Sequence, residues 1–286
     1  MNLKRAIIQG IKEGLSFPKL SLILVFSILI FTSFVGLSIW SWFDYPIGHT
    51  SYISKLLQGY DHDLFQDLIN NQGAGYHIVS KLVFWSIILY WIFTPFLNGG
   101  LVGNLLDEKD NFTNFLKNGS HHYFPFLRIS ILFILLHIFI LLILSAIAFF
   151  AINWSLTYFI SELPALYIIA LAVFIYTIFC MWLIAAAILS KFIYSNDVGK
   201  VGPSVKSAFC MVFSQKTKFF IVGTIFLLIG LGFGIGLNLL VNLIIEKNLA
   251  FVILAILCQF FILYFRSTIR IIFYSTYKYL FLQQEI

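Results

Sequence analysis

A chain of 286 residues in which 60% are hydrophobic and only 10% are charged cannot cover itself as a water-soluble protein, because soluble domains carry roughly 25% charged residues. Its net charge of +6 comes from Lys and Arg that flank apolar stretches, a pattern that membrane headgroups explain and that argues against nucleic-acid binding. The three cysteines form no CxxC or other spaced pair, so neither a disulfide framework nor a metal knuckle is predicted.

The chain opens with an amphipathic stretch. Leu3, Ile7, Ile11 and Leu15 recur at every fourth position, and charged residues occupy the opposite face. Residues four apart lie on one side of a helix, and an apolar stripe opposite a basic face is typical of a helix that lies in the plane of the membrane interface.

Six charge-poor stretches follow, each close to the roughly 20 residues that cross a ~30 Å hydrocarbon core. Their backbones must be helical there, because lipid offers no hydrogen-bond partners. The predicted transmembrane helices are 20–43, 82–106, 126–150, 165–190, 219–243 and 249–272.

The six spans pair into three hairpins, and an amphipathic stretch precedes each pair. The stretch before the third hairpin repeats Val201, Val205, Phe209 and Val212, whereas the one before the second is shorter and centres on Phe112–Lys117. The sequence therefore predicts an all-α integral membrane protein with a single membrane domain, 1–286. Its expected plan is three hairpins, each preceded by a cytoplasmic interfacial amphipathic helix.

The basic residues set the predicted orientation. If both termini and the second and fourth loops are cytoplasmic, 15 of the 18 Lys and Arg lie inside and three lie outside. This bias follows the positive-inside rule and places the chain in a bacterial cytoplasmic (inner) membrane. Loop 44–81 is then the only sizeable extracytoplasmic segment.

That loop holds the one acidic cluster with metal-ligating residue types. Asp63 and Asp67 share a helical face, and Asp61 or His62 could complete an oxygen-rich cation site. The alternative is a solvated acidic face, and the sequence predicts no metal site and no cofactor.

Near the end of the second span, Pro95 frees a backbone carbonyl, and Asn98 could cap the freed groups. After this span, His121 and His122 follow the acidic turn Asp107–Asp110. A histidine pair with carboxylates could form a metal or general-base site, although neighbouring helical residues point about 100° apart. We interpret the pair as anchors at headgroup level.

Polar residues inside the spans form a further candidate group. His137 and Gln259 lie near the bilayer midplane, where polar side chains are costly and often functional. The alternative, which we favour, is a hydrogen bond between helices, either between these two or to Asn238 or Tyr176.

The fifth span contains Gly230, Gly232, Gly234 and Gly236, here called the glycine seam. They form two overlapping GxxxG pairs, a pattern that lets another helix backbone approach closely. The seam predicts tight packing in the first place, and a hinge or a ligand slot as alternatives.

The segment from Pro95 to Leu127 resembles a pattern in bacterial six-helix membrane families of unknown function, which include the membrane domain attached to some glycerophosphodiester phosphodiesterases. The shared elements are Pro95 with Gly99 and Gly100, the charged turn Asp107–Asp110, and an aromatic-rich helix ending near Gly119. The resemblance implies a helical-hairpin membrane module without catalytic residues of its own. The soluble phosphodiesterase barrel is absent from this sequence.

These patterns favour a non-enzymatic membrane protein: a subunit, scaffold or assembly partner of a larger complex, with the lipid bilayer and other membrane proteins as partners. The alternative is a transporter or channel for an apolar or lipid-like solute, with the glycine seam and the level of His137 and Gln259 as its path. A membrane-embedded enzyme acting on lipid headgroups, through His121, His122 and the acidic turn Asp107–Asp110, is the third hypothesis.

Overall fold

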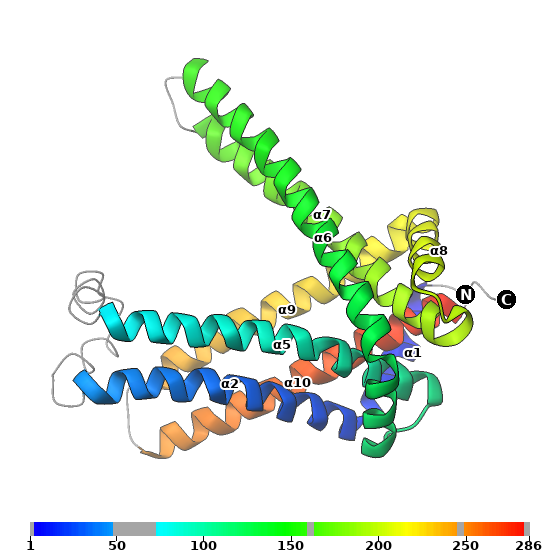
Figure 1. Ribbon diagram of the computed structural model, residues 1–286, viewed down its shortest axis with the longest axis horizontal. Coiled ribbons are helices and arrows are strands. Elements are labelled where there is room, and N and C mark those ends of the chain that lie inside the picture. The colour runs from blue at the N-terminus through cyan, green and yellow to red at the C-terminus, as the bar shows by residue number, and fades with distance from the viewer. Residues whose placement is uncertain (1–2, 48–72, 159–162, 245–248, 283–286) are drawn as a thin grey trace. The chain divides into compact units, whose positions relative to one another are not determined.

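The computed structural model describes residues 3–47, 73–158, 163–244 and 249–282, and every element formed by these residues is a helix (Figure 1). In chain order the elements are α1 (Leu3–Leu15), α2 (Pro18–Ile47), α5 (Gly73–Asp107), α6 (Phe112–Tyr158), α7 (Leu163–Ile193), the π-helical turn η1 (Tyr194–Val198), α8 (Val201–Ser214), α9 (Lys216–Ile244) and α10 (Leu249–Leu282).

Five of the described helices, α5, α6, α7, α9 and α10, are long and apolar enough to cross a membrane. The number rises to six if α1 and α2, which meet at a bend of 74°, are counted as one broken span. Each predicted transmembrane segment falls inside one of the observed helices. The prediction of an all-helical, membrane-embedded protein is therefore confirmed at this level.

Two boundaries differ from the prediction. Helix α2 continues to Ile47 and α5 begins at Gly73, so both ends of the predicted loop 44–81 are helical. Residues 48–72, with the cation-site candidates Asp61, His62, Asp63 and Asp67, lie outside the described residues.

The amphipathic stretch before the second hairpin is not a separate helix, because α6 runs unbroken from Phe112 to Tyr158 with Pro125 inside it. Proline removes one backbone hydrogen bond, but Phe115 and Gly119 before it and Phe126 and Ile129 after it are all buried. Packing on both sides of Pro125 holds the two halves in one helix, which outweighs the local preference for a break.

The chain divides into two compact units, each described by itself here. Unit 1 comprises Met1–Pro18, Pro95–Phe233 and Thr268–Ile286, and unit 2 comprises Lys19–Thr94 and Gly234–Ser267.

Unit 2 packs through aromatic side chains. The Phe31 ring of α2 lies 5.4 Å from Tyr90 and 5.4 Å from Phe93 of α5, measured between ring centroids. Hydroxyl groups on its helices donate to carbonyls one turn back, as Ser27 does to Ile23 at 2.8 Å. These bonds satisfy polar groups within the helix, as a membrane-embedded segment requires.

Unit 1 has the larger core. Leu97, Leu101 and Leu105 of α5 repeat at every fourth position and are all fully buried, so one face of this part of α5 is apolar. The largest fully buried side chains of the other helices in this unit are Phe115, Phe126 and Ile129 of α6, Leu189 and Phe192 of α7, Phe219 of α9 and Tyr277 of α10.

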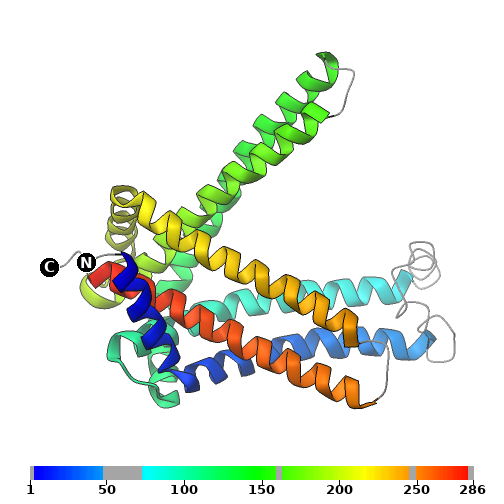
Figure 2. The same ribbon diagram turned by 180° about the vertical axis from the view of Figure 1, so that it is seen from behind.

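Helices α6 and α7 run side by side as a long hairpin within unit 1 (Figures 1 and 2). Toward the end of α6 and the start of α7, the buried residues are small: Ser155 of α6 and Ala165 of α7. The large apolar side chains there are exposed instead: Phe149, Phe150, Trp154, Tyr167 and Phe174. The outer half of this hairpin is therefore covered by little of the described chain.

Candidate functional site

The C-terminal part of α10 carries a row of polar residues at helical spacing. Arg270, Tyr274 and Lys278 are four apart, so they lie along one side of the helix. Tyr274 and Lys278 are buried among helices of unit 1. Buried polar groups need partners, and this row finds them in two clusters.

The first, the Asn98 cluster, comprises Asn98, Lys191, Arg270 and Tyr274. Asn98 of α5 is 3% exposed. Its Oδ1 accepts hydrogen bonds from Arg270 Nη2 at 2.8 Å and from the Tyr274 hydroxyl at 2.9 Å. The Asn98 amide thus joins α5 to α10 and fixes the positions of two donors.

Lys191 brings a second positive charge to this cluster. It lies near the end of α7, is 6% exposed and is close enough to Arg270 and Tyr274 to interact with them electrostatically. The next residue, Phe192, has its ring centroid 6.5 Å from that of Tyr274. Among the described residues, neither Lys191 nor Arg270 has a carboxylate oxygen within 4.0 Å.

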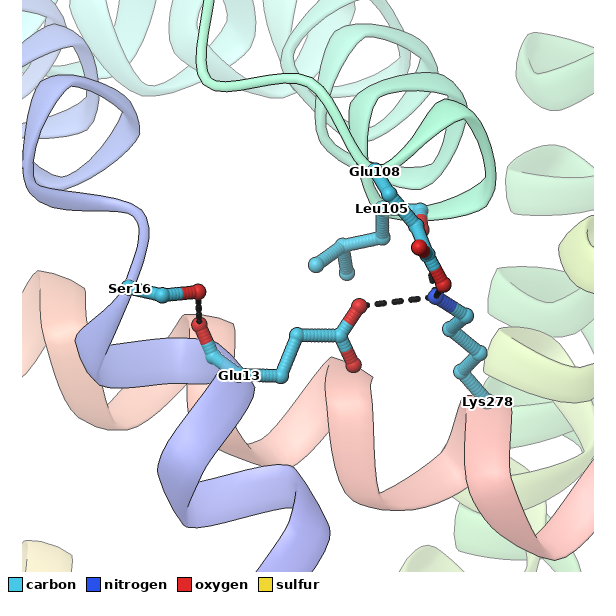
Figure 3. Close-up of polar contacts among 5 residues, drawn as sticks. All are labelled: Glu13, Ser16, Leu105, Glu108 and Lys278. Atoms are coloured by element: carbon cyan, nitrogen blue, oxygen red, sulfur yellow. Dashed lines mark hydrogen bonds and ion pairs between the residues drawn. The ribbon is translucent and has the colours of Figure 1, made fainter.

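The second, the Lys278 cluster, comprises Glu13, Leu105, Glu108 and Lys278 (Figure 3). Lys278 Nζ lies 2.7 Å from Glu13 Oε1 of α1 and 3.4 Å from Glu108 Oε1, and it donates to the Leu105 carbonyl at 2.6 Å. The side chains of Lys278 and Glu13 are 4% and 9% exposed. One ammonium group therefore joins α1, the end of α5 and α10.

Helix α1 lies beside the C-terminal part of α10, the dark blue and red segments in Figure 2, and small residues of α1 form the contact. Ala6, Gly10 and Gly14 form the buried face of α1. A Cβ added at Gly10 would lie 2.8 Å from Thr276 N, and one added at Gly14 would lie 2.8 Å from Ile272 Cα. The two backbones are close because α1 has no side chain there, the contact that small-xxx-small spacing allows between membrane helices.

The end of α1 is also fixed locally. Ser16 Oγ donates to the Glu13 carbonyl at 2.7 Å (Figure 3). Pro18 then begins α2, where its missing N–H would have no intrahelical partner in any case. Within α1, the Glu13 side chain is 9% exposed, whereas Ile11 and Leu15 are exposed.

The end of α5 places Glu108 beside Lys278. Glu108 has a φ of 54°, and Lys109 N donates to the Asn104 carbonyl at 3.1 Å, as in a Schellman helix end. The left-handed conformation costs a non-glycine residue roughly 1–2 kcal/mol, and the Glu108 side chain is 75% exposed, so its 3.4 Å contact with Lys278 contributes little.

We therefore expect Glu108→Gly to raise the free energy of unfolding by about 0.5–1 kcal/mol, after allowance for the greater flexibility of unfolded glycine. Denaturation in mixed micelles would measure it. Glu108→Ala is the matched control, because it loses the same carboxylate but keeps the strain. Equal effects of the two variants would contradict this account.

The charged turn considered in the third hypothesis is held by amides. Asp107 Oδ2 accepts from Asn114 Nδ2 at 2.8 Å and from Asn118 Nδ2 at 3.1 Å. His122 stacks on Phe126, with ring centroids 5.4 Å apart, and its edge-on neighbour is His121 at 4.7 Å. No group of three metal-ligating side chains occurs among the described residues.

The remaining predicted site residues are not gathered into one place. His137 Nδ1 lies 2.7 Å from the Phe133 carbonyl of its own helix. Gln259 is an exposed residue of unit 2. Asn238 belongs to α9, but its side chain lies outside the described part of the chain. Pro95 is buried inside α5.

The glycine seam does not form the predicted packing surface within the described residues. A Cβ at Gly230, Gly232, Gly234 or Gly236 would meet nothing within 4 Å. Tight packing there stays a prediction, and the described residues show close helix contacts at other glycines, among them Gly10 and Gly14. A GxxxG pair allows a second helix to approach closely, but whether a helix packs there depends on the tertiary structure.

Of the residues considered as site candidates, Asn98 belongs to the first cluster, and Glu108 of the acidic turn belongs to the second. Lys191, Arg270 and Lys278 were interpreted only as markers of orientation, and Glu13 as part of a solvated face. The four-residue spacing of Arg270, Tyr274 and Lys278 was the available signal. Comparison with protein families, with curated proteins and with solved structures finds no match for this chain.

Proposed function

We propose that this protein is a non-enzymatic assembly partner within a larger complex of a bacterial cytoplasmic membrane, with both termini on the cytoplasmic side. The observation that carries the proposal is the bare α6–α7 hairpin. Only 6% of the most apolar stretch of α6 is buried in the described structure, against 17–28% for the other four single-helix spans. Transmembrane helices of a second protein are the occupant that we propose for this surface.

The use of the polar groups supports a structural role. Lys278 and Asn98 bind residues of other helices in unit 1 rather than lining a path. The cytoplasmic placement of the termini rests on the 15-to-3 division of basic residues. The resemblance of Pro95–Leu127 to hairpin modules of bacterial membrane families fits the same role and remains part of the proposal.

The two other hypotheses receive less support. For transport, the bond of His137 to its own helix and the open surroundings of the described glycine seam supply no coupled elements. For a headgroup enzyme, Asp107 is occupied by two asparagine amides and His122 by an aromatic stack.

Photo-crosslinking in intact membranes tests the proposal. A photoreactive phenylalanine analogue at Phe150 or Tyr167, which are 72% and 71% exposed, is expected to give a discrete adduct with a different protein. The same group at Leu228 of α9, 61% exposed, is the control and should give far less protein adduct.

Three results would overturn the proposal. The first is no protein adduct from the hairpin together with repeated purification of the chain alone in mild detergent. The second is an adduct of two copies of this chain only. The third is equal protein adducts from the hairpin and from Leu228, which would indicate contacts without a defined surface.

A further inference from the structure

The Asn98 cluster holds two positive charges and no negative one. Lys191 is almost fully buried. Three acidic residues of unit 1 have partners outside this cluster: Glu13 and Glu108 bind Lys278, and Asp107 accepts from asparagine amides. An ammonium group removed from water without a counter-charge is strongly unfavourable. Among the side chains that the structure describes, no anion completes the cluster.

The cluster also has more hydrogen-bond donors than acceptors. An arginine side chain carries five N–H donors and a lysine ammonium carries three, whereas the acceptor that the structure gives Arg270 is Asn98 Oδ1. The Tyr274 hydroxyl uses the same oxygen. Toward the described part of the chain, most donors of Arg270 and the donors of Lys191 therefore remain available to a ligand with several acceptor oxygens.

The surroundings indicate which anion fits. Lys191 follows 28 uncharged residues, Leu163–Ser190, so it lies where the apolar part of α7 ends. Basic pockets between transmembrane helices at this level bind the phosphates of lipid headgroups. A phosphate group offers several oxygens to a guanidinium fork and a point-like ammonium together.

We propose that Lys191 and Arg270 form a binding site for a phosphate group. Asn98, which accepts from Arg270, and Tyr274, whose ring centroid lies 6.0 Å from the Arg270 guanidinium, are the residues that position Arg270. The phosphate comes from a phospholipid headgroup or from a soluble phosphate. This site is distinct from the exposed α6–α7 surface proposed for a protein partner. Evidence against the assembly function would therefore not count against phosphate binding.

Native mass spectrometry of the detergent-purified chain tests the lipid source. Phosphatidylglycerol is expected to stay bound, whereas diacylglycerol, which has no phosphate, is not. Lys191→Met and Arg270→Gln should each weaken phosphatidylglycerol binding about tenfold, as loss of a charge-assisted contact implies. Arg266→Gln is the matched control, because Arg266 lies one turn earlier on α10 and is exposed; its effect should stay below about twofold.

Thermal unfolding of delipidated protein tests the soluble source. Inorganic phosphate should raise the melting temperature above that in chloride of equal ionic strength, and Arg270→Gln should abolish the difference. A response to phosphatidylglycerol but not to inorganic phosphate assigns the site to a lipid headgroup, and the reverse assigns it to a soluble phosphate.

If Lys191→Met does not fold, Lys191→Arg and Tyr274→Phe keep the test decisive. Lys191→Arg should retain binding because it keeps the positive charge. Tyr274→Phe should weaken binding less than Arg270→Gln does, because the hydroxyl donates its one proton to Asn98 and not to the ligand. Wild-type binding of both ligands in Lys191→Met and Arg270→Gln, or no response of the wild type to either ligand, would overturn the proposal.

Discussion

Replacement of Lys278 by Met is expected to lower the free energy of unfolding by about 3 kcal/mol, the usual size for removal of one partner of a buried ion pair. The change leaves the Glu13 carboxylate, 9% exposed and 2.7 Å from the lost ammonium, without its cation. It also leaves the Leu105 carbonyl without the donor that lies 2.6 Å away. Denaturation in mixed micelles, read by helix content and by tyrosine fluorescence, would measure the loss.

A double variant separates the ion pair from packing. Lys278→Met combined with Glu13→Leu removes both charges, and an apolar replacement of a buried pair is often close to neutral, so most of the lost stability should return. Lys206→Met is the control, because Lys206 is an exposed residue of α8 and should change little. If the double variant were no more stable than Lys278→Met, the buried charge would not be the cause.

Gly14→Ala carries the second large effect, a loss of about 2 kcal/mol. The new Cβ would lie 2.8 Å from Ile272 Cα and 2.9 Å from Ile272 N, and these are backbone atoms that cannot rotate away. Overpacking costs typically 1–3 kcal/mol and occasionally more, which exceeds the gain of up to about 1 kcal/mol from alanine in a helix. Detachment of α1 from α10 is the expected consequence, and faster proteolysis of residues 3–15 would report it alongside the denaturation midpoint.

Gly232→Ala in α9 is the matched control for this prediction. A Cβ there meets nothing within 4 Å among the described residues, so the intrinsic preference of alanine should dominate and stability should rise by up to about 1 kcal/mol. Equal losses at Gly14 and Gly232 would contradict the assignment of the close contact to α1.

The transmembrane helices could be predicted because their cause is local. A charge-poor stretch of about 20 residues must satisfy its own backbone in lipid, whatever packs against it. The unbroken α6 could not be predicted in this way, because the continuity across Pro125 depends on burial of Phe115 and Phe126 by other helices.

The polar clusters were hidden from the sequence for a different reason. A lysine beyond an apolar stretch ordinarily reaches the headgroups, and nothing near Lys278 in the sequence shows that Glu13 lies beside it. Likewise, GxxxG occurs at Gly10/Gly14, Gly99/Gly103, Gly230/Gly234 and Gly232/Gly236, and which of these pairs makes a close contact depends on which helices meet. The stripe of Ala6, Gly10 and Gly14 was a sequence signal for a close helix contact.

The contact of α1 with α10 has a consequence for the order of assembly. Glu13 and Lys278 are 265 residues apart in the chain, so the buried face of α1 has no binding surface until α10 has been synthesised. During translation, the face of α1 formed by Ala6, Gly10 and Gly14 therefore has no partner on α10 while the helices between them are being made. Docking of α1 is then one of the last steps of folding, and a chain that stops before Thr268 would leave Glu13 without its counter-ion.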